Sequence, residues 1–143
     1  MLAWVGKEIG VSNWLQISQE QIDTFARITG DDHWIHVDTE RAKKEMPDGK
    51  TIAHGFFTLS LIPFLVRSVY QIEQRGRGIN YGSNRVRYVS PVQVGARVRL
   101  RQSIKAAEAM EGGVKITSDC VIEIEGHTRP AVVAEFLMVV YDN

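Results

Sequence analysis

Residues 54–70 read HGFFTLSLIPFLVRSVY, and this stretch decides the fold class. Apolar residues occupy every side of a helix drawn through it, which is typical of a helix that is buried all round. Its most apolar part, residues 56–66, is shorter than the about 20 residues that a membrane-spanning helix needs, so we expect no membrane span. Pro63 lies inside the stretch and lacks a backbone N–H, so we expect a kink there.

Beyond this helix the apolar pattern changes to a period of two, after Gly78. Strands are predicted over residues 80–89, 97–107, 114–125 and 131–140. Four or five antiparallel strands with one wholly apolar helix predict an α+β fold, in which the sheet wraps around a long central helix. One small sheet does not cover such a helix on all sides, so we also expect a homodimer.

Composition indicates one folded domain over residues 1–143, because 44% of residues are hydrophobic and 24% are charged. The 17 basic and 17 acidic residues balance and no recognition motif is present, which argues against a nucleic-acid partner. Cys120 is the single cysteine, so an internal disulfide and a cysteine-rich zinc site are excluded. With no segment resembling a signal peptide, we expect a cytoplasmic protein.

The first half of the chain has helical signals. Ser18 and Gln21 form a capping-box pattern and Gly30 is a typical helix stop, so a helix is predicted between them. Residues 31–38 are expected to form a loop, and a short charged helix is expected near residues 40–46.

The densest set of reactive side chains lies in this loop, within the sequence TGDDHWIHVD of residues 29–38. Catalytic groups concentrate on loops that a rigid scaffold holds. A turn between Asp31 and His36 would direct both side chains into one pocket, where such a pair can position and deprotonate a water. The alternative is a solvated loop in which Asp31 only helps to terminate the preceding helix.

A metal site competes for the same residues. His33 and His36, with Asp31 or Asp38, offer nitrogen and oxygen ligands. The His-x-x-His spacing on a loop is weak evidence, and no cysteine or Glu-x-x-His motif supports it, so we expect no metal.

Gly55 stands where the apolar helix begins. A glycine at this position leaves backbone N–H groups directed outward, which suits them to hold an oxyanion. The alternative is that Gly55 serves only close packing.

Three motifs, in order, resemble the signature of MaoC-like dehydratases and (R)-specific enoyl-CoA hydratases of the hot-dog fold. They are GDDHWIHVD at residues 30–38, TIAHGFFTLSLIPFL at 51–65 and NYGSNRVRYVSPVQVGARVRL at 80–100. This version is most similar to the nodulation protein N-like branch, over about residues 14–105. The resemblance implies a homodimer in which each antiparallel sheet wraps the central helix.

The resemblance also implies roles for single residues. The catalytic pair falls on Asp31 and His36, which would activate one water for addition to a trans-2-enoyl thioester, giving the (R)-3-hydroxyacyl product. The glycine whose N–H binds the thioester carbonyl falls on Gly55, and a pocket serine falls on Ser60. Many members have Asn-Pro where this chain has His33-Trp34. We therefore expect His33 to replace that asparagine in supporting the loop, or to alter substrate choice.

We accordingly predict an (R)-specific enoyl-thioester hydratase/dehydratase, a hydro-lyase acting on acyl-CoA or acyl-carrier thioesters. It would need no cofactor beyond the coenzyme A of its substrate. Two alternatives remain open: an acyl-CoA thioesterase, in which Asp31 directs water at the carbonyl, and a non-catalytic acyl-CoA-binding module.

The basic residues are unevenly distributed. Residues 74–107 contain eight basic residues and no acidic one, so the rest of the chain has a net charge of minus eight. By the period of two, Arg85 and Arg87 share one strand face, as do Arg97, Arg99 and Arg101. Arg85 and Arg87 are therefore candidate contacts for CoA phosphates. The alternative is a solvated outer face that pairs with the chain's own acidic residues.

Overall fold

The computed structural model describes residues 2–73 and 76–142. Its central feature is a six-stranded antiparallel sheet in the order β1-β4-β5-β6-β3, with the short β2 also paired to β4. The strands are β1 (Lys7–Val11), β2 (Leu15–Gln16), β3 (Gly78–Tyr88), β4 (Arg97–Met110), β5 (Gly113–Ile124) and β6 (Val132–Tyr141). The four long strands agree with the predicted segments to within a few residues, whereas β1 and β2 were not predicted individually.

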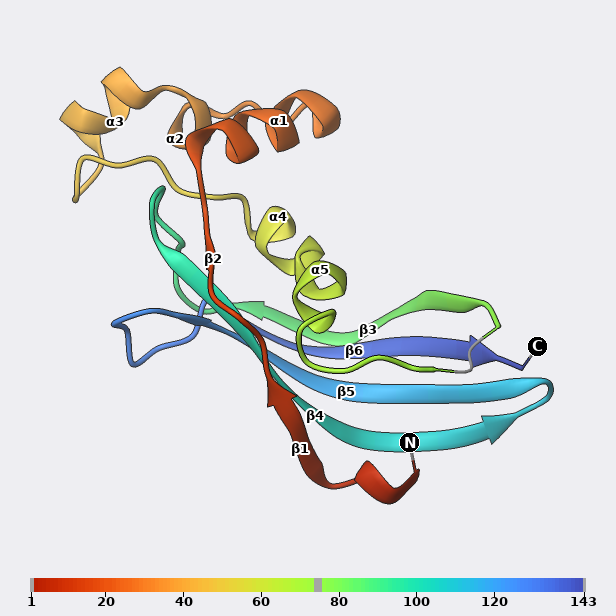
Figure 1. Cartoon of the computed structure of the whole chain (residues 1–143). Coiled ribbons are helices and arrows are strands. Elements are labelled where there is room, and N and C mark those ends of the chain that lie inside the picture. Colours follow the sequence, from red (N-terminus) through yellow and green to blue (C-terminus); the bar gives the residue numbers. More distant parts are fainter. Residues whose placement is uncertain (1, 74–75, 143) are drawn as a thin grey trace.

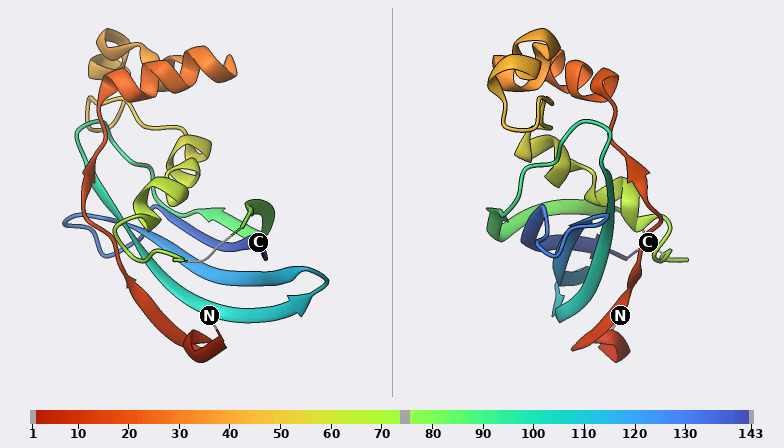
Figure 2. Two further views of the ribbon diagram at one scale, coloured as in Figure 1. Left: turned by 45° about the vertical axis from the view of Figure 1, so that its right-hand side comes forward. Right: turned by 90° about the vertical axis from the view of Figure 1, so that its left-hand side faces the viewer.

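The sheet curves around two short helices, α4 (Gly55–Ser60) and α5 (Ile62–Val66). The remaining helices, α1 (Gln19–Thr29), α2 (Trp34–Val37) and α3 (Thr39–Glu45), lie beyond α4, farther from the sheet (Figure 1, Figure 2). A single 3-10 turn, η1 (Leu2–Trp4), precedes β1. This is the α+β hot-dog arrangement.

The single helix predicted over residues 54–70 is wrong in length. The chain forms α4 and α5, joined at Leu61, and continues in turns after Val66. Pro63 is the physical reason, because it has no N–H to donate to the carbonyl of Leu59 and its ring opposes a continuous helix there. Proline is tolerated in the first turn of a helix, so α5 begins anew around it.

The helix pair is also not buried all round within one chain. Ile62 and Leu65 are at most 3% exposed and belong to the core against the inner face of the sheet. Phe56 and Phe64 are 70% and 53% exposed. Among the described residues, no helix is long and apolar enough to cross a membrane.

Helix α1 begins and ends as predicted. The Ser18 side chain accepts from the Gln21 N–H and the Gln21 side chain accepts from the Ser18 N–H, which completes the capping box. Gly30 ends the helix in the left-handed conformation, at φ 77°. The expected loop over residues 31–38 is partly wrong, since it contains the one-turn helix α2. Asp31 follows Gly30, the residue that caps α1, and His36 lies within α2.

Candidate active site

His36 is the most buried titratable group of the reactive segment, at 8% exposure. Its Nδ1 lies 2.7 Å from the carbonyl oxygen of Ile52, and an N–H donor at Nδ1 leaves Nε2 free to accept a proton. Burial lowers the pKa of His36 below its ordinary value of 6.5, and this outweighs the upward effects of the Ile52 hydrogen bond and the Asp31 charge. His36 is therefore neutral, and can act as a base, at neutral pH.

The position of His36 is fixed from two sides. The Ile52 N–H donates to the carbonyl of Ile35 at 3.1 Å, which ties the segment before α4 to α2. Gln19, at the start of α1, donates to the carbonyl of His36 at 2.8 Å and accepts from the hydroxyl of Thr51. The capped end of α1 and the segment before α4 thus hold the base between them.

His54 joins Asp31 to His36. It is 2% exposed, and its ring stacks on that of His36 with 3.8 Å between centroids and 25° between planes. Its Nε2 lies 2.8 Å from the carbonyl oxygen of Asp31, and its Nδ1 has no partner among the described residues. Ligand-type atoms of the three side chains all lie within 4.8 Å of one another. Asp31 and His36 therefore lie close together, as was predicted from their spacing in the sequence.

No role for His54 was predicted from the sequence. The available signal was an ionisable residue directly before the glycine that begins the apolar helix, in the motif AHG of residues 53–55. Nothing in that pattern shows that its ring stacks on a residue of α2.

The same three residues are the group best placed to hold a metal ion. Zinc takes histidine nitrogens at about 2.0–2.1 Å with each lone pair directed at the ion. The rings of His36 and His54 stack with 25° between their planes, and Nε2 of His54 lies 2.8 Å from the carbonyl oxygen of Asp31.

A cavity of about 330 Å³ opens beside His36 and contains Gly55 in its wall. Gly55 is the first residue of α4, so its N–H lies outside the hydrogen bonding within the helix. A Cβ at this position would lie 2.8 Å from Cδ1 of Tyr88, so a larger residue requires the ring to move. Gly55 thus combines close packing with an N–H donor next to the base.

Ser60 and His33 are not among the residues that line this cavity. The Ser60 hydroxyl donates to the carbonyl of Phe57 at 2.6 Å, within α4. The Nδ1 of His33 accepts from the Ile35 N–H and so caps α2, and its ring centroid is 6.5 Å from that of His36. His33 therefore supports the short helix that carries the base.

Arg85 and Arg87 lie on the sheet face that points away from the cavity. In the register of β3 with β6 they are opposite Glu135 and Val133, whereas the neighbouring Tyr88 faces the cavity. A phosphate group bound by these arginines must therefore reach around the edge of β3.

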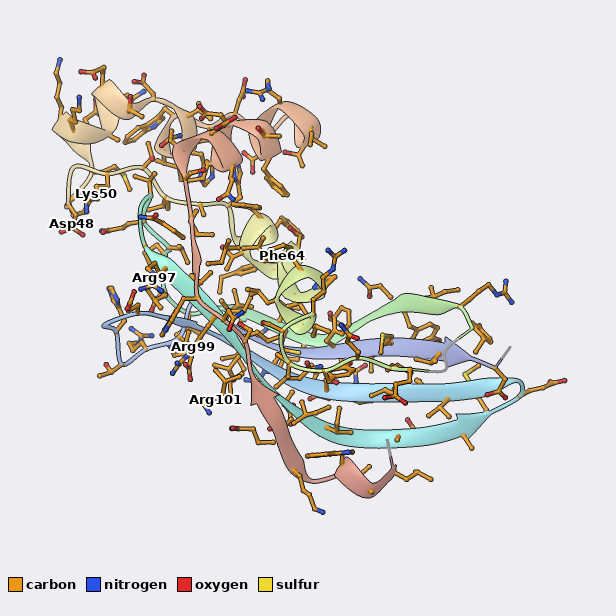
Figure 3. All side chains as sticks on the ribbon, viewed as in Figure 1. Asp48, Lys50, Phe64, Arg97, Arg99 and Arg101 are labelled. Atoms are coloured by element: carbon orange, nitrogen blue, oxygen red, sulfur yellow. The ribbon has the colours of Figure 1, made fainter. Side chains whose placement is uncertain are left out.

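The other arginine face is paired with glutamates. Arg97, Arg99 and Arg101 follow one another along β4 (Figure 3). The ion pairs are Arg97–Glu125 at 3.0 Å, Arg99–Glu123 at 2.6 Å, Arg101–Glu123 at 2.8 Å and Arg101–Glu8 at 3.0 Å. Acidic residues from elsewhere in the chain thus neutralise this row of arginines. This is the arrangement expected of a solvated outer face that pairs with the chain's own acidic residues.

A curved sheet packs against a short apolar helix pair, His36 lines a cavity there, and Asp31 lies close to His36 but is not among the residues that line that cavity. This fold and site define a hot-dog enzyme of the hydro-lyase class. The MaoC like domain matches residues 2–123, and the chain belongs to the MaoC-like dehydratase family.

Similarity to individual proteins supports this family membership. The chain is 45% identical over 139 residues to 3-hydroxyacyl-thioester dehydratase Z of Mycobacterium tuberculosis, covering 96% of this chain and 91% of that protein. It is 41% identical over 138 residues to nodulation protein N of Rhizobium leguminosarum bv. viciae, covering 95% and 86%. The solved structure of the (R)-hydratase from A. caviae involved in PHA biosynthesis has the same fold, with a TM-score of 0.72 over 94% of each chain at 22% identity.

Proposed function

We propose that the protein catalyses the reversible hydration of a trans-2-enoyl thioester to the (R)-3-hydroxyacyl thioester. The observation that carries this proposal is the neutral His36, with Nε2 open, beside Asp31 and in the same cavity as Gly55. The similarity to a protein named 3-hydroxyacyl-thioester dehydratase supports the same reaction.

Hydration needs a nucleophilic water at C3, a proton at C2 and stabilisation of the charge that develops on the thioester oxygen. His36 takes one proton from a water that Asp31 also holds, and the water oxygen forms the bond to C3. The electron pair of the double bond moves toward the thioester oxygen, where the Gly55 N–H stabilises the enolate. The proton then goes to C2, and dehydration is the reverse of these steps.

The substrate is proposed to be an acyl-CoA or an acyl-carrier thioester. Arg85 and Arg87 are exposed on β3 and are the proposed contacts for CoA phosphates around that edge of the sheet. A pocket role for Ser60 rests on the resemblance alone, since Ser60 lines neither of the two cavities of about 330 and 610 Å³.

The proposed functional unit is a homodimer. Strand β3 ends the sheet, so one row of its backbone groups has no partner strand among residues 2–73 and 76–142. Phe56 and Tyr88, next to this edge, are exposed and contact each other at 6.1 Å between ring centroids. A second copy of the chain would cover both the edge and these apolar rings.

Incubation with crotonyl-CoA tests the reaction, because hydration removes the absorbance of the conjugated enoyl thioester. Asp31→Asn and His36→Asn should each lower the rate by about 10²–10⁴-fold, the usual contribution of a general acid or base. Release of free thiol, measured in parallel, would instead show a thioesterase. Full activity in both variants would contradict the assignment of these two residues.

A further inference from the structure

A second cavity, of about 610 Å³, lies at the opposite end of the helix pair from His36. Ile62 and Val66 of α5 form one wall, and Phe136 of β6 lies on the sheet side. Its volume is within the usual range of small-molecule sites, which is about 300–1,000 Å³. None of the proposed catalytic residues lines it, so it is not part of the reaction centre.

One side chain in this cavity has an unmet hydrogen-bonding group. Gln102, on β4, is 1% exposed, and its Oε1 has no partner among the described residues. Leu100 and Ile104, which share its strand face, are 0% exposed, so Gln102 is a polar residue in a row of core residues. Buried amides in native proteins are nearly always hydrogen-bonded, and an unpaired one points to a partner.

Ser118 adds a second polar group to the same wall. It is 3% exposed, lies on the neighbouring strand β5 and lines the same cavity. In the sheet register Gln102 is opposite Cys120, so Ser118 is its diagonal neighbour on the inner face. The cavity thus has an apolar wall on α5 and a hydrogen-bonding wall on the sheet.

The two cavities lie in line along the same elements. Strand β6 contributes Val132 to the cavity beside His36 and Phe136 to the second cavity. These residues are on the same strand face, and four residues of strand span about 13 Å. The helix pair contributes Thr58 to the first cavity and Ile62 to the second, about one helical turn apart. Both cavities are therefore lined by the helix pair and by β6, and the second one has Gln102 of β4 in its wall.

We propose that the second cavity binds the distal end of the acyl chain, and that Gln102 selects chains with a hydroxyl group there. This proposal rests on the proposed hydratase function. The methylene groups pack against Ile62 and Val66, and the hydroxyl donates to Oε1 of Gln102. The substrate class is therefore a hydroxylated acyl thioester in preference to a plain alkyl one.

The test compares ω-hydroxy-trans-2-decenoyl-CoA with trans-2-decenoyl-CoA, using kcat/KM for hydration and calorimetric binding. Crotonyl-CoA, too short to reach the second cavity, reports on the reaction centre. The variant is Gln102→Leu, which keeps the volume and removes the hydrogen-bonding groups. Gln71→Leu makes the same change at an exposed residue of the same cavity and is the matched control.

The wild type should prefer the hydroxylated substrate by about tenfold or more, as expected for one buried hydrogen bond. Gln102→Leu should lose this preference and keep wild-type turnover of crotonyl-CoA, while Gln71→Leu should keep both. If the wild type hydrates crotonyl-CoA but hydrates the two decenoyl substrates equally well, the proposal is overturned and the hydratase function is retained. An equal loss on all three substrates in Gln102→Leu would also overturn it, because Gln102 would then act on a part common to all thioesters or on the fold.

If the protein turns over no enoyl-CoA, the proposed function fails, and calorimetry still decides on the cavity. Tighter binding of the hydroxylated chain that disappears in Gln102→Leu would support the hydroxyl site. Equal binding of the two chains by the wild type would reject it.

Discussion

At the scale of single residues, the chemistry of His36 depends on opposing effects of its surroundings. Burial disfavours the charged imidazolium, whereas the Ile52 carbonyl and the Asp31 charge favour it. Burial has the larger effect, so the ring is a base where an exposed histidine would be partly protonated. The Ile52 carbonyl still determines which nitrogen carries the proton, and therefore leaves Nε2 as the nitrogen that can accept one.

The lowered pKa of His36 predicts a pH dependence of both activity and stability. Hydration should persist below pH 6.5 and fall only as the pH drops through the depressed pKa. Between that pKa and 6.5 the unfolded chain binds more protons than the folded one, so the free energy of unfolding should decrease as the pH is lowered through this window. Above pH 6.5 the stabilising contribution should be complete.

Profiles of kcat/KM against pH, with urea unfolding at the same pH values, measure both effects. His36→Gln should remove the pH slope of stability in this window. His127→Gln, at an exposed turn, should leave the slope unchanged. An acid limb of activity above pH 6.5 would show that the pKa is raised instead.

His54 is predicted to be a positioning residue that acts through Asp31 and His36. His54→Leu removes the donor to the Asp31 carbonyl and the stacked ring, and should lower kcat by about 10²-fold, the usual cost of a small displacement of catalytic groups. His54→Gln keeps an N–H at the end of the side chain and should recover part of this loss. Because the His54 charge lowers the pKa of His36, the acid limb of the Leu variant should also move to higher pH. If His54→Leu only reduced the fraction of folded protein, the pH of the acid limb would not change.

At this scale the proximity of Asp31 and His36 was predictable from the sequence, whereas the residues that hold them in place were not, and the catalytic roles of the pair stay a prediction. Asp31 and His36 are five positions apart in a reactive segment, and a local turn suffices to bring them together. The stacking of His54 on His36 depends on how α4 approaches α2, which no local pattern contains. The same holds for Gln102, whose side chain is noteworthy only because the sheet buries it.

At the scale of elements, helix α1 was predictable to the residue because both of its ends carry side-chain or glycine signals. The ends of the apolar helix could not be predicted in the same way. Its residues are apolar on every side of the helix, and this pattern does not indicate where the backbone hydrogen bonding is interrupted. Pro63 indicated a kink, and the structure shows a full break at Leu61 with a second helix after it. Strands β1 and β2 were missed because five and two residues are too few for a periodic pattern.

The capping box of α1 provides a test of how an element supports the site. Ser18→Ala should destabilise the protein by about 0.5–2 kcal/mol, because the Gln21 N–H loses its partner. Gln19, which holds the His36 carbonyl, is the next residue, so kcat should fall as well. Thr24→Ala, in the middle of the same helix, is the matched control and should be neutral or slightly stabilising. Urea unfolding and crotonyl-CoA turnover measure the two effects, and equal behaviour of both variants would contradict this role of the cap.

At the scale of the whole molecule, the uneven charge along the sequence is balanced locally by ion pairs across the sheet. The basic segment that includes β3 and β4 lies beside β5, β6 and β1, which supply Glu123, Glu135 and Glu8. Arg85 and Arg87 have no such glutamate ion pair within 4 Å among the described residues. Arg85 and Arg87 are accordingly the residues proposed to contact the phosphates of an anionic substrate.

The proposed dimer makes the final prediction at this scale. A sheet that ends in an eleven-residue edge strand, beside exposed aromatic rings on α4 and α5, is an aggregation hazard unless a second chain covers it. In solution the wild type should therefore have twice the mass of one chain by analytical ultracentrifugation. Phe64→Glu, which places a charge on the exposed side of α5, should yield monomers.

The matched control is Leu2→Glu, which adds the same charge to a 75% exposed residue next to β1, at the opposite edge of the sheet. This variant should remain a dimer, because the proposed assembly pairs the edge formed by β3 and leaves the edge formed by β1 uncovered. A monomeric wild type, or a dimer that survives in Phe64→Glu and dissociates in Leu2→Glu, would place the interface elsewhere. The exposed rings of the helix pair would then need another explanation, since their apolar pattern is what first predicted a partner.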